Sequence, residues 1–297
     1  MTRPIAKWRL RTHVLELGVH TLVMGVVNIT PDSFSDGGRF PAAAAAAAEA
    51  LKHFDEGAAI VDLGAESTRP GTAVGAAAGV SAAEEQARLL PVIERVIRAR
   101  PDAILSVDTY KAATARAALA AGAEIVNDVS GFTWDGEMPR VCAEMNAGVV
   151  LMHTRGRPEE WRTQARLKGD EVLAMVRDGL GSSLALAEKA GIAGDAIVLD
   201  PGYGFGKRFE ENYGLLARQA ELLVLGRPLL AGLSRKSFLG HTLAPLFGGE
   251  AAPVGARETA TIAATVAAIL HGASIVRVHA VWPAVEAALT ADAILAG

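Results

Sequence analysis

The sequence has little of what marks several common classes of protein. Of its 297 residues one is cysteine, Cys142, which excludes a disulfide within the chain and a cysteine-rich zinc site. The formal net charge is -4 at pH 7, so no broad basic surface for nucleic acid or a membrane is expected. No apolar run approaches the roughly 18 residues of a membrane span, and the first residues lack the apolar core of a signal peptide. We therefore expect a cytoplasmic protein that binds neither nucleic acid nor a membrane.

Short apolar runs alternate with helical stretches along most of the chain. Runs such as LVMGVVN and AIVLDPG are typical of strands that are buried on both faces. Four of the runs follow a glycine that can end a helix, as in FDEGAAIVDLG. Eight such runs separated by helical segments predict a (βα)8 TIM barrel of the α/β class, with a doubly wound open sheet as the alternative. We expect one domain, in which residues 1–20 form a β-hairpin at the barrel bottom and residues 21–297 form the barrel.

Polar side chains follow each of the eight expected strands. In such a barrel the carboxyl ends of all strands lie on one face, which is where the active sites of TIM barrels are found. Buried polar groups are costly unless they have partners, so their concentration on one face predicts a polar ligand. In chain order, the residues at these ends include Asn28, Asp62, Asp108, Asn127, His153, Asp200, Lys236, Arg277 and His279.

The residue types at these ends indicate a ligand with two parts. Asp108, Asn127 and Asp200 carry oxygens that accept hydrogen bonds from a planar ring with several N–H groups. Basic side chains suit a phosphate or diphosphate, and arginine can bind one through two hydrogen bonds. A flat, donor-rich ring joined to an anion is therefore expected. The basic residues concerned are Arg69, Arg235, Lys236, Arg277 and His279.

Eight short motifs, in order from about residue 20 to the end of the chain, resemble those of the dihydropteroate synthases. They are NITPDSFSDGG, ESTRPG, SVDT, NDVSG, LMH, DPGYGFGK, SRKSFLG and RVH. The resemblance implies a pterin-binding barrel that joins 6-hydroxymethyl-7,8-dihydropterin diphosphate to p-aminobenzoate by a dissociative mechanism. It also implies a role in folate synthesis, inhibition by sulfonamides, a Mg²⁺ cofactor and a homodimer.

The resemblance further assigns roles to individual residues. Asp108, Asp200, Lys236 and Arg277 are the expected catalytic residues, and Asp36 is expected to order the first loop, residues 30–40. The residues expected to bind the pterin are Asp108, Asn127, Val129, Met152, Asp200, Phe205 and Lys236. Those expected to bind the diphosphate are Asn28, Arg69, Arg277 and His279, with Asn28 also a ligand of Mg²⁺. Those expected to contact p-aminobenzoate are Phe34, Thr68, Pro70 and Ser237.

Some of these positions allow a structural interpretation. Asp62 follows an apolar run and fits a structural role as well as a functional one, and His153 is expected to be a core histidine. The run GYGFGK lacks the glycine spacing of a dinucleotide-binding loop. It is expected instead to bring Phe205 and Lys207 to the pocket.

Two other functions are compatible with parts of the pattern. A methyltetrahydrofolate:corrinoid methyltransferase would share Asp108, Asn127 and Asp200 but needs no diphosphate site. A non-catalytic pterin-binding barrel is expected to lack loop or anion-binding residues, which are present here. The chain departs from the family pattern at Thr154, where methionine is common, and at Ala280, where aspartate is common. Neither departure is expected to abolish activity.

Overall fold

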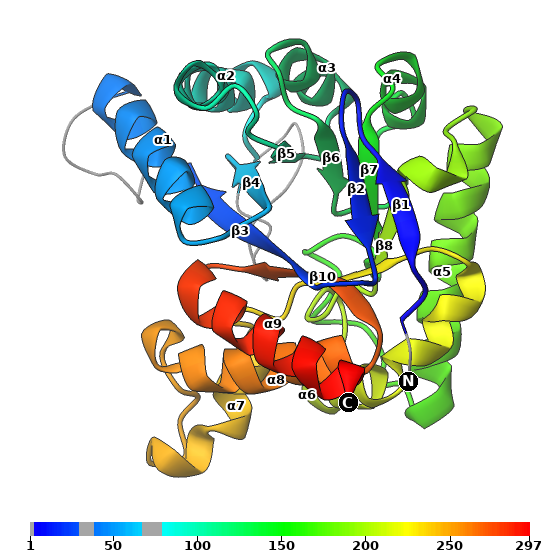
Figure 1. Cartoon of the computed structure of the whole chain (residues 1–297). Helices are drawn as coiled ribbons and strands as arrows, with labels where there is room; N and C mark the ends of the chain where they lie inside the picture. The colour runs from blue at the N-terminus through cyan, green and yellow to red at the C-terminus, as the bar shows by residue number, and fades with distance from the viewer. Residues whose placement is uncertain (1–2, 30–38, 67–78) are drawn as a thin grey trace.

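The eight predicted strands pair in chain order and close into a parallel barrel (Figure 1). The computed structural model describes residues 3–29, 39–66 and 79–297. The last strand of the barrel pairs with both its first and its seventh strand, so the alternative of an open, doubly wound sheet is wrong. The barrel strands are β3 (Leu22–Asn28), β4 (Ile60–Gly64), β5 (Leu105–Asp108), β6 (Ile125–Asp128), β7 (Gly148–Met152), β8 (Ile197–Asp200), β9 (Leu229–Ala231) and β10 (Ala273–Val278).

Helices connect the strands and cover the outside of the barrel (Figure 1). Helix α2 (Ala82–Ala99) illustrates the sequence signals, because Ser81 caps it by accepting a hydrogen bond from the Glu84 N–H at 3.2 Å. Its buried residues Leu89, Ile93 and Val96 recur at helical spacing. None of the described helices is long and apolar enough to cross a membrane. The helices are α1 (Arg39–Asp55), α2 (Ala82–Ala99), α3 (Ala112–Ala120), α4 (Met138–Glu144), α5 (Gly169–Lys189), α6 (Phe209–Ala217), α7 (Ser237–Thr242), α8 (Glu258–Leu270) and α9 (Val281–Ala296).

The glycines predicted to end helices do so in most of the repeated units. Gly57 and Gly122 have φ angles of 100° and 117°, which residues with a Cβ rarely adopt. Before β7 the left-handed residue is Asn146 instead, with φ of 52°. Gly148 has a different role there, because a Cβ on it would lie 2.5 Å from the Leu10 side chain. Its conformation is unexceptional, and close packing requires the glycine.

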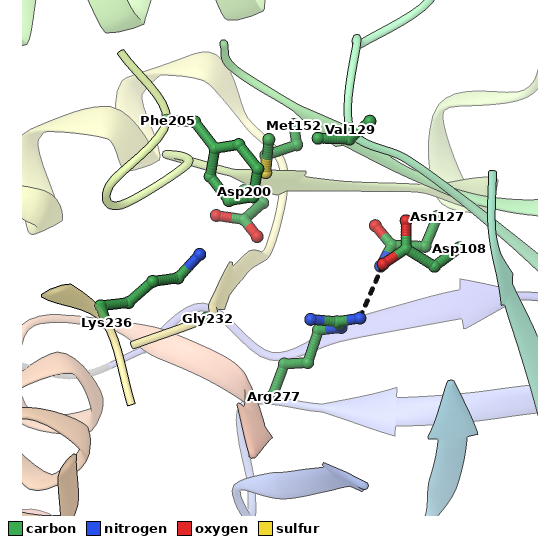
Figure 2. A pocket seen from close by; sticks show the side chains of 9 residues that line it. All are labelled: Asp108, Asn127, Val129, Met152, Asp200, Phe205, Gly232, Lys236 and Arg277. Atoms are coloured by element: carbon green, nitrogen blue, oxygen red, sulfur yellow. Dashed lines mark hydrogen bonds and ion pairs between the residues drawn. The ribbon is translucent and has the colours of Figure 1, made fainter. Parts of the chain in front are cut away.

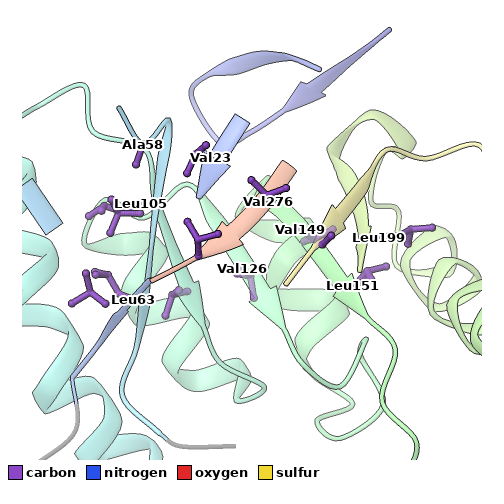
Figure 3. Packing of buried hydrophobic residues seen from close by; sticks show 14 of the residues in the cluster. Val23, Ala58, Leu63, Leu105, Val126, Val149, Leu151, Leu199 and Val276 are labelled. Carbon is purple, nitrogen blue, oxygen red and sulfur yellow. The ribbon is translucent and has the colours of Figure 1, made fainter. Parts of the chain in front are cut away.

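Side chains of the strands alternate between two apolar regions. Leu63, Val126 and Val149 point outward and pack in the main core between barrel and helices (Figure 3). Ile60 and Ile125 point inward and belong to a second cluster inside the barrel, near the amino ends of the strands. Burial on both faces explains why the strands appear in the sequence as continuous apolar runs.

The N-terminal residues form the predicted hairpin at the amino-terminal end of the barrel. Strands β1 (Ala6–Arg9) and β2 (Val14–Leu17) pair antiparallel. Trp8 and Leu17 are fully buried and join the inner apolar cluster, and Trp8 Nε1 donates a hydrogen bond to the Ala196 carbonyl at 3.0 Å. The hairpin therefore fills the barrel bottom and leaves the opposite end for the polar residues.

Candidate active site

The two-residue period of the strands places the predicted site residues inside the barrel. Ile60 and Ile125 belong to the inner apolar cluster. Asp62 and Asn127 stand two residues further along the same strands, so their side chains point to the same face. The same step leads from Val198 of this cluster to Asp200. A polar layer therefore lies directly above the apolar one, at the carboxyl ends of the strands.

A pocket opens in this polar layer (Figure 2). All seven residues predicted to bind the pterin line it, together with Arg277 and Gly232. Gly232 was not predicted. It follows β9, and a Cβ there would lie 3.6 Å from Asp200 Oδ2, so a side chain at this position would extend into the space beside that carboxylate.

Arg277 joins two carboxylates on one side of the pocket. Its Nη2 donates to Asp108 Oδ2 at 2.7 Å, as Figure 2 shows, and its Nε donates to Asp62 Oδ2 at 2.6 Å. The Asn127 amide also donates to Asp62 Oδ2, at 2.9 Å. Asp62 is thus part of the site's hydrogen-bond network, although it does not line the pocket. Burial raises the pKa of Asp108 to about 7, Arg277 opposes this rise and Asp62 adds to it.

Lys236 and Asp200 occupy the other side of the pocket. Figure 2 shows the Lys236 ammonium directed toward the Asp200 carboxylate. The same ammonium lies 4.0 Å from the centre of the Phe205 ring, a favourable cation–π arrangement. Burial lowers the pKa of Lys236 to about 8 and raises that of Asp200. The lowered pKa leaves Lys236 able to donate hydrogen bonds at neutral pH with a less firmly held proton.

Apolar side chains form the wall between these two polar sides. Val129 and Met152 pack with Tyr110, Trp134 and Phe205 in a small cluster. Tyr110 and Trp134 meet edge to face with ring centres 5.1 Å apart. These two aromatic residues were not predicted. The sequence signal was their position, since Tyr110 directly follows SVDT and Trp134 comes three residues after NDVSG ends.

The residues predicted for the anion lie on neighbouring strands. Asn28 ends β3, and β3 pairs with β10, which carries Arg277. His279 follows β10, and its Nδ1 lies 2.9 Å from Ser234 Oγ. Ser237 is exposed and is the first residue of α7, directly after Lys236. The structure therefore places Asn28, Arg277 and His279 at adjacent strand ends.

Five predicted residues cannot be compared with the structure. They lie in segments 30–38 and 67–78, outside the described residues. Their roles stay predictions. They are Phe34, Asp36, Thr68, Arg69 and Pro70.

Lys207 does not reach the pocket, contrary to expectation. Its ammonium donates to the main-chain carbonyls of Gly202 at 2.7 Å, His153 at 3.2 Å and Phe205 at 3.3 Å. Burial lowers the pKa of Lys207 to about 7. These bonds hold the loop that carries Phe205, so Lys207 acts through the backbone. His153 is buried as expected for a core histidine, and burial keeps its pKa well below the usual value.

Comparisons with known proteins match this geometry to one family. The model of the pterin binding enzymes matches residues 24–279. The dihydropteroate synthase of Synechocystis is 41% identical over 281 residues, which cover 95% of this chain and 92% of that protein. The Escherichia coli dihydropteroate synthase is 41% identical over 278 residues, covering 93% and 92%. The chain belongs to the dihydropteroate synthase family of pterin-binding enzymes.

Other relatives extend this assignment. Membership of the family makes the chain a transferase. The structure of the Xanthomonas albilineans dihydropteroate synthase with 4-aminobenzoic acid has a TM-score of 0.85 and 38% identity, covering 99% of this chain and 100% of that one. The chain also matches a mitochondrial bifunctional folate synthesis protein of Pisum sativum at 40% identity, but it spans only 55% of that protein's length.

Proposed function

We propose that this chain condenses 6-hydroxymethyl-7,8-dihydropterin diphosphate with p-aminobenzoate to give 7,8-dihydropteroate and diphosphate. The observation that carries the proposal is one pocket in which Asp108, Asn127 and Asp200 face Lys236 and Arg277. Carboxylate and amide oxygens suit a donor-rich ring, and the two cations suit its carbonyl and its anionic substituent. Relatives named dihydropteroate synthase, about two-fifths identical over most of both chains, support the same reaction.

The pterin ring lies between the polar and apolar walls of the pocket. Asp108 and Asp200 accept hydrogen bonds from the ring N–H and amino groups, and Lys236 donates to the ring carbonyl or N5. Met152 and Phe205 pack against its faces. Asp108 and Asp200 each accept a hydrogen bond from the protein, from Arg277 and the Gly202 N–H respectively, and keep further acceptor capacity. A ring with several donors therefore fits the site better than an apolar ligand.

The reaction breaks the carbon–oxygen bond between the pterin methylene group and the diphosphate. The bonding electrons leave with the diphosphate oxygen, where Arg277 stabilises the developing charge. Asp108 and Asp200 stabilise the electron-poor pterin cation. The amine nitrogen of p-aminobenzoate then forms the new carbon–nitrogen bond and loses one proton. A strong general base is not required, because the acceptor of the amine's electrons is a cation.

Mg²⁺ fits as the cofactor, with Asn28 as its protein ligand. Among the described residues there is no group of three or more His, Cys, Asp or Glu side chains that could hold a metal. A Cβ on Gly64 would lie 3.9 Å from Asn28 Oδ1 and 3.8 Å from Asp108 Oδ2, so this glycine leaves room beside two hard oxygen donors. Mg²⁺ keeps several waters and takes other ligands from substrate phosphates. When bound, it would neutralise charge on the leaving diphosphate.

Three further properties belong to the proposal. Phe34, Thr68, Pro70 and the exposed Ser237 contact p-aminobenzoate, and sulfonamides compete at this subsite. A sulfonamide complex of the Yersinia pestis synthase, 36% identical with a TM-score of 0.85, supports the inhibition.

The protein works in the cytoplasm. It forms a homodimer. Large apolar side chains are exposed on α9, such as Trp282 with 57% of its surface accessible, and a partner subunit would bury them.

Diphosphate release tests the proposed function. Purified protein is mixed with the dihydropterin diphosphate and Mg²⁺, with and without p-aminobenzoate, and the pterin product is identified by mass. Release that requires p-aminobenzoate and yields dihydropteroate supports the synthase. Binding of the pterin without release under either condition contradicts it and favours the non-catalytic barrel. A methyltetrahydrofolate assay tests the methyltransferase, which the comparisons do not favour.

A further inference from the structure

Asp62 is the most completely buried carboxylate of the site, and only one of its two oxygens accepts hydrogen bonds from the described residues. Its side chain is 0% exposed, whereas that of Asp108 is 25% exposed. Oδ2 of Asp62 accepts hydrogen bonds from both Arg277 and Asn127. Within the part of the chain that the structure describes, Oδ1 of Asp62 has no hydrogen-bond partner. A buried carboxylate oxygen without a partner is costly, so this atom calls for an explanation.

Arg277 divides its donors between two carboxylates that differ in access to the pocket. Its Nε donates to Asp62 and its Nη2 donates to Asp108. Asp108 lines the pocket, whereas Asp62 lies beneath it and is not among the lining residues. The Asp108 oxygen that holds Arg277 is thus an acceptor that a pterin ring also needs. Arg277 contacts only Oδ2 of Asp108, but a ring with two adjacent N–H donors needs both oxygens and therefore competes with Arg277 for Oδ2.

The unused oxygen of Asp62 resolves this competition. A guanidinium presents Nε and one Nη group along the same edge, and this edge matches both oxygens of a single carboxylate. We propose that Asp62 is a positioning residue that takes both donors of Arg277 when the pterin binds, which frees Asp108 for the ring. Arg277 then changes partners without losing its hydrogen bonds and keeps its remaining N–H groups for the diphosphate. This inference rests on the proposed function.

Asp62 also sets the orientation of the Asn127 side chain. A carboxylate can only accept hydrogen bonds, so the amide must present its NH₂ group to Asp62. The carbonyl oxygen of Asn127 is therefore left for a ring N–H. One buried carboxylate thus orients two residues of the pocket, Asn127 and Arg277, without contacting the ligand itself.

The substitution Asp62→Asn tests the exchange. Asparagine keeps the size of the side chain but offers one acceptor oxygen in place of two, so Arg277 stays on Asp108 and competes with the ring. We expect the Kd for 6-hydroxymethylpterin, measured by calorimetry, to rise about tenfold or more, and kcat/KM for diphosphate release to fall by at least as much. The matched control is Ser106→Ala, because Ser106 is buried beside Asp62 on the neighbouring strand. The control should bind and react like the wild type.

A double-mutant cycle separates this role from a structural one. In an Arg277→Gln background the competition is absent and only the effect on Asn127 remains, so adding Asp62→Asn should raise the pterin Kd by a clearly smaller factor than it does in the wild type. Equal effects of Asp62→Asn in both backgrounds, or a wild-type Kd in the single variant, would overturn the inference. If Asp62→Asn alone unfolds, the comparison of Arg277→Gln with the double variant still tests the inference, because the double variant removes both charges of the Asp62–Arg277 pair. A rise of about tenfold in the pterin Kd between these two proteins would then overturn it.

Pterin binding distinguishes failure of this inference from failure of the proposed function. If the wild type binds 6-hydroxymethylpterin but never releases diphosphate, the synthase proposal fails, and the cycle still decides the role of Asp62. If release is normal and the cycle is additive, only the role of Asp62 fails. If the wild type does not bind the pterin, both fail.

Discussion

The two ends of the barrel are built from the same strands, and one step of the strand pattern separates their chemistry. Ile60 and Ile275 belong to the inner apolar cluster that holds Trp8 of the hairpin. Two residues later the same strands carry Asp62 and Arg277, which form an ion pair at 2.6 Å. Two residues of parallel strand span about 6.6 Å. One step along the strands thus takes the barrel interior from an apolar layer around Trp8 to buried charges that pair with one another.

The end of the barrel that the β1–β2 hairpin fills is expected to contribute to stability without affecting ligand affinity. Trp8→Ala removes a fully buried side chain and its hydrogen bond to Ala196. We expect the free energy of unfolding to fall by about 3–5 kcal/mol. Chemical denaturation measures this loss, and calorimetry at a temperature where the variant is folded should give an unchanged pterin Kd. A large rise in that Kd would show that the two ends are coupled.

The polar end is expected to behave in the opposite way. Lys236→Ala removes the ammonium that faces Asp200 and lies over the Phe205 ring. We expect kcat/KM for diphosphate release to fall by about 10²–10³-fold, with a melting temperature close to that of the wild type. Steady-state kinetics and thermal denaturation of the same samples check both parts. Unfolding of the variant would make Lys236 a structural residue.

The pH dependence of pterin binding separates the two ends further. The pKa of Asp108 is raised to about 7, so this carboxylate gains its proton as the pH falls through 7. Only the ionised form accepts hydrogen bonds with both oxygens, and pterin affinity should therefore fall below pH 7, by at most about tenfold per unit. Burial is the largest cause of the raised pKa; Arg277 and Lys236 lower the pKa of Asp108, and Asp62 and Glu85 raise it.

Calorimetry at several pH values measures this effect. In Asp108→Asn the dependence near pH 7 should disappear, although the affinity will be low throughout. A wild-type affinity that stays constant between pH 6 and 8 would contradict the assignment of Asp108 to the ring.

The smallest effect is expected at Thr154, where the chain departs from the family pattern. Its hydroxyl donates to the Gly156 carbonyl at 3.0 Å, and Thr154 does not line the pocket. Thr154→Met should therefore leave kcat/KM within about twofold of the wild type. Kinetics with both substrates check this, and a tenfold change would extend the active site beyond the residues that surround the pocket.

Much of the barrel and of the pterin pocket could be predicted from the sequence. The apolar runs predicted where the strands lie. The polar residues at the ends of these runs predicted that Asp108, Asn127 and Asp200 face a ligand. These predictions succeed because parallel strands that pair in chain order bring all of their carboxyl ends to one face of the barrel. Individual pocket roles came from the resemblance to a family and still await tests.

Other features depended on contacts that no local pattern encodes. The bonds of Asp62 to Arg277 and Asn127 join residues 215 and 65 positions apart. Lys207 was expected in the pocket, but its three backbone carbonyls come from a folded loop. A lysine in a glycine-rich loop gives no sign in the sequence of whether its ammonium meets a ligand or the chain itself.

The most direct measurement is to follow the oxygen that joins the pterin methylene group to the diphosphate. The substrate is prepared with ¹⁸O at this bridging position and is turned over with p-aminobenzoate and Mg²⁺. The proposed reaction breaks the carbon–oxygen bond of the substrate. Mass spectrometry should therefore find all of the label in the released diphosphate, and the pterin product should be joined to the amine. Label that remains on a 6-hydroxymethylpterin product would show that the phosphorus–oxygen bond had broken instead, and would contradict the proposed function.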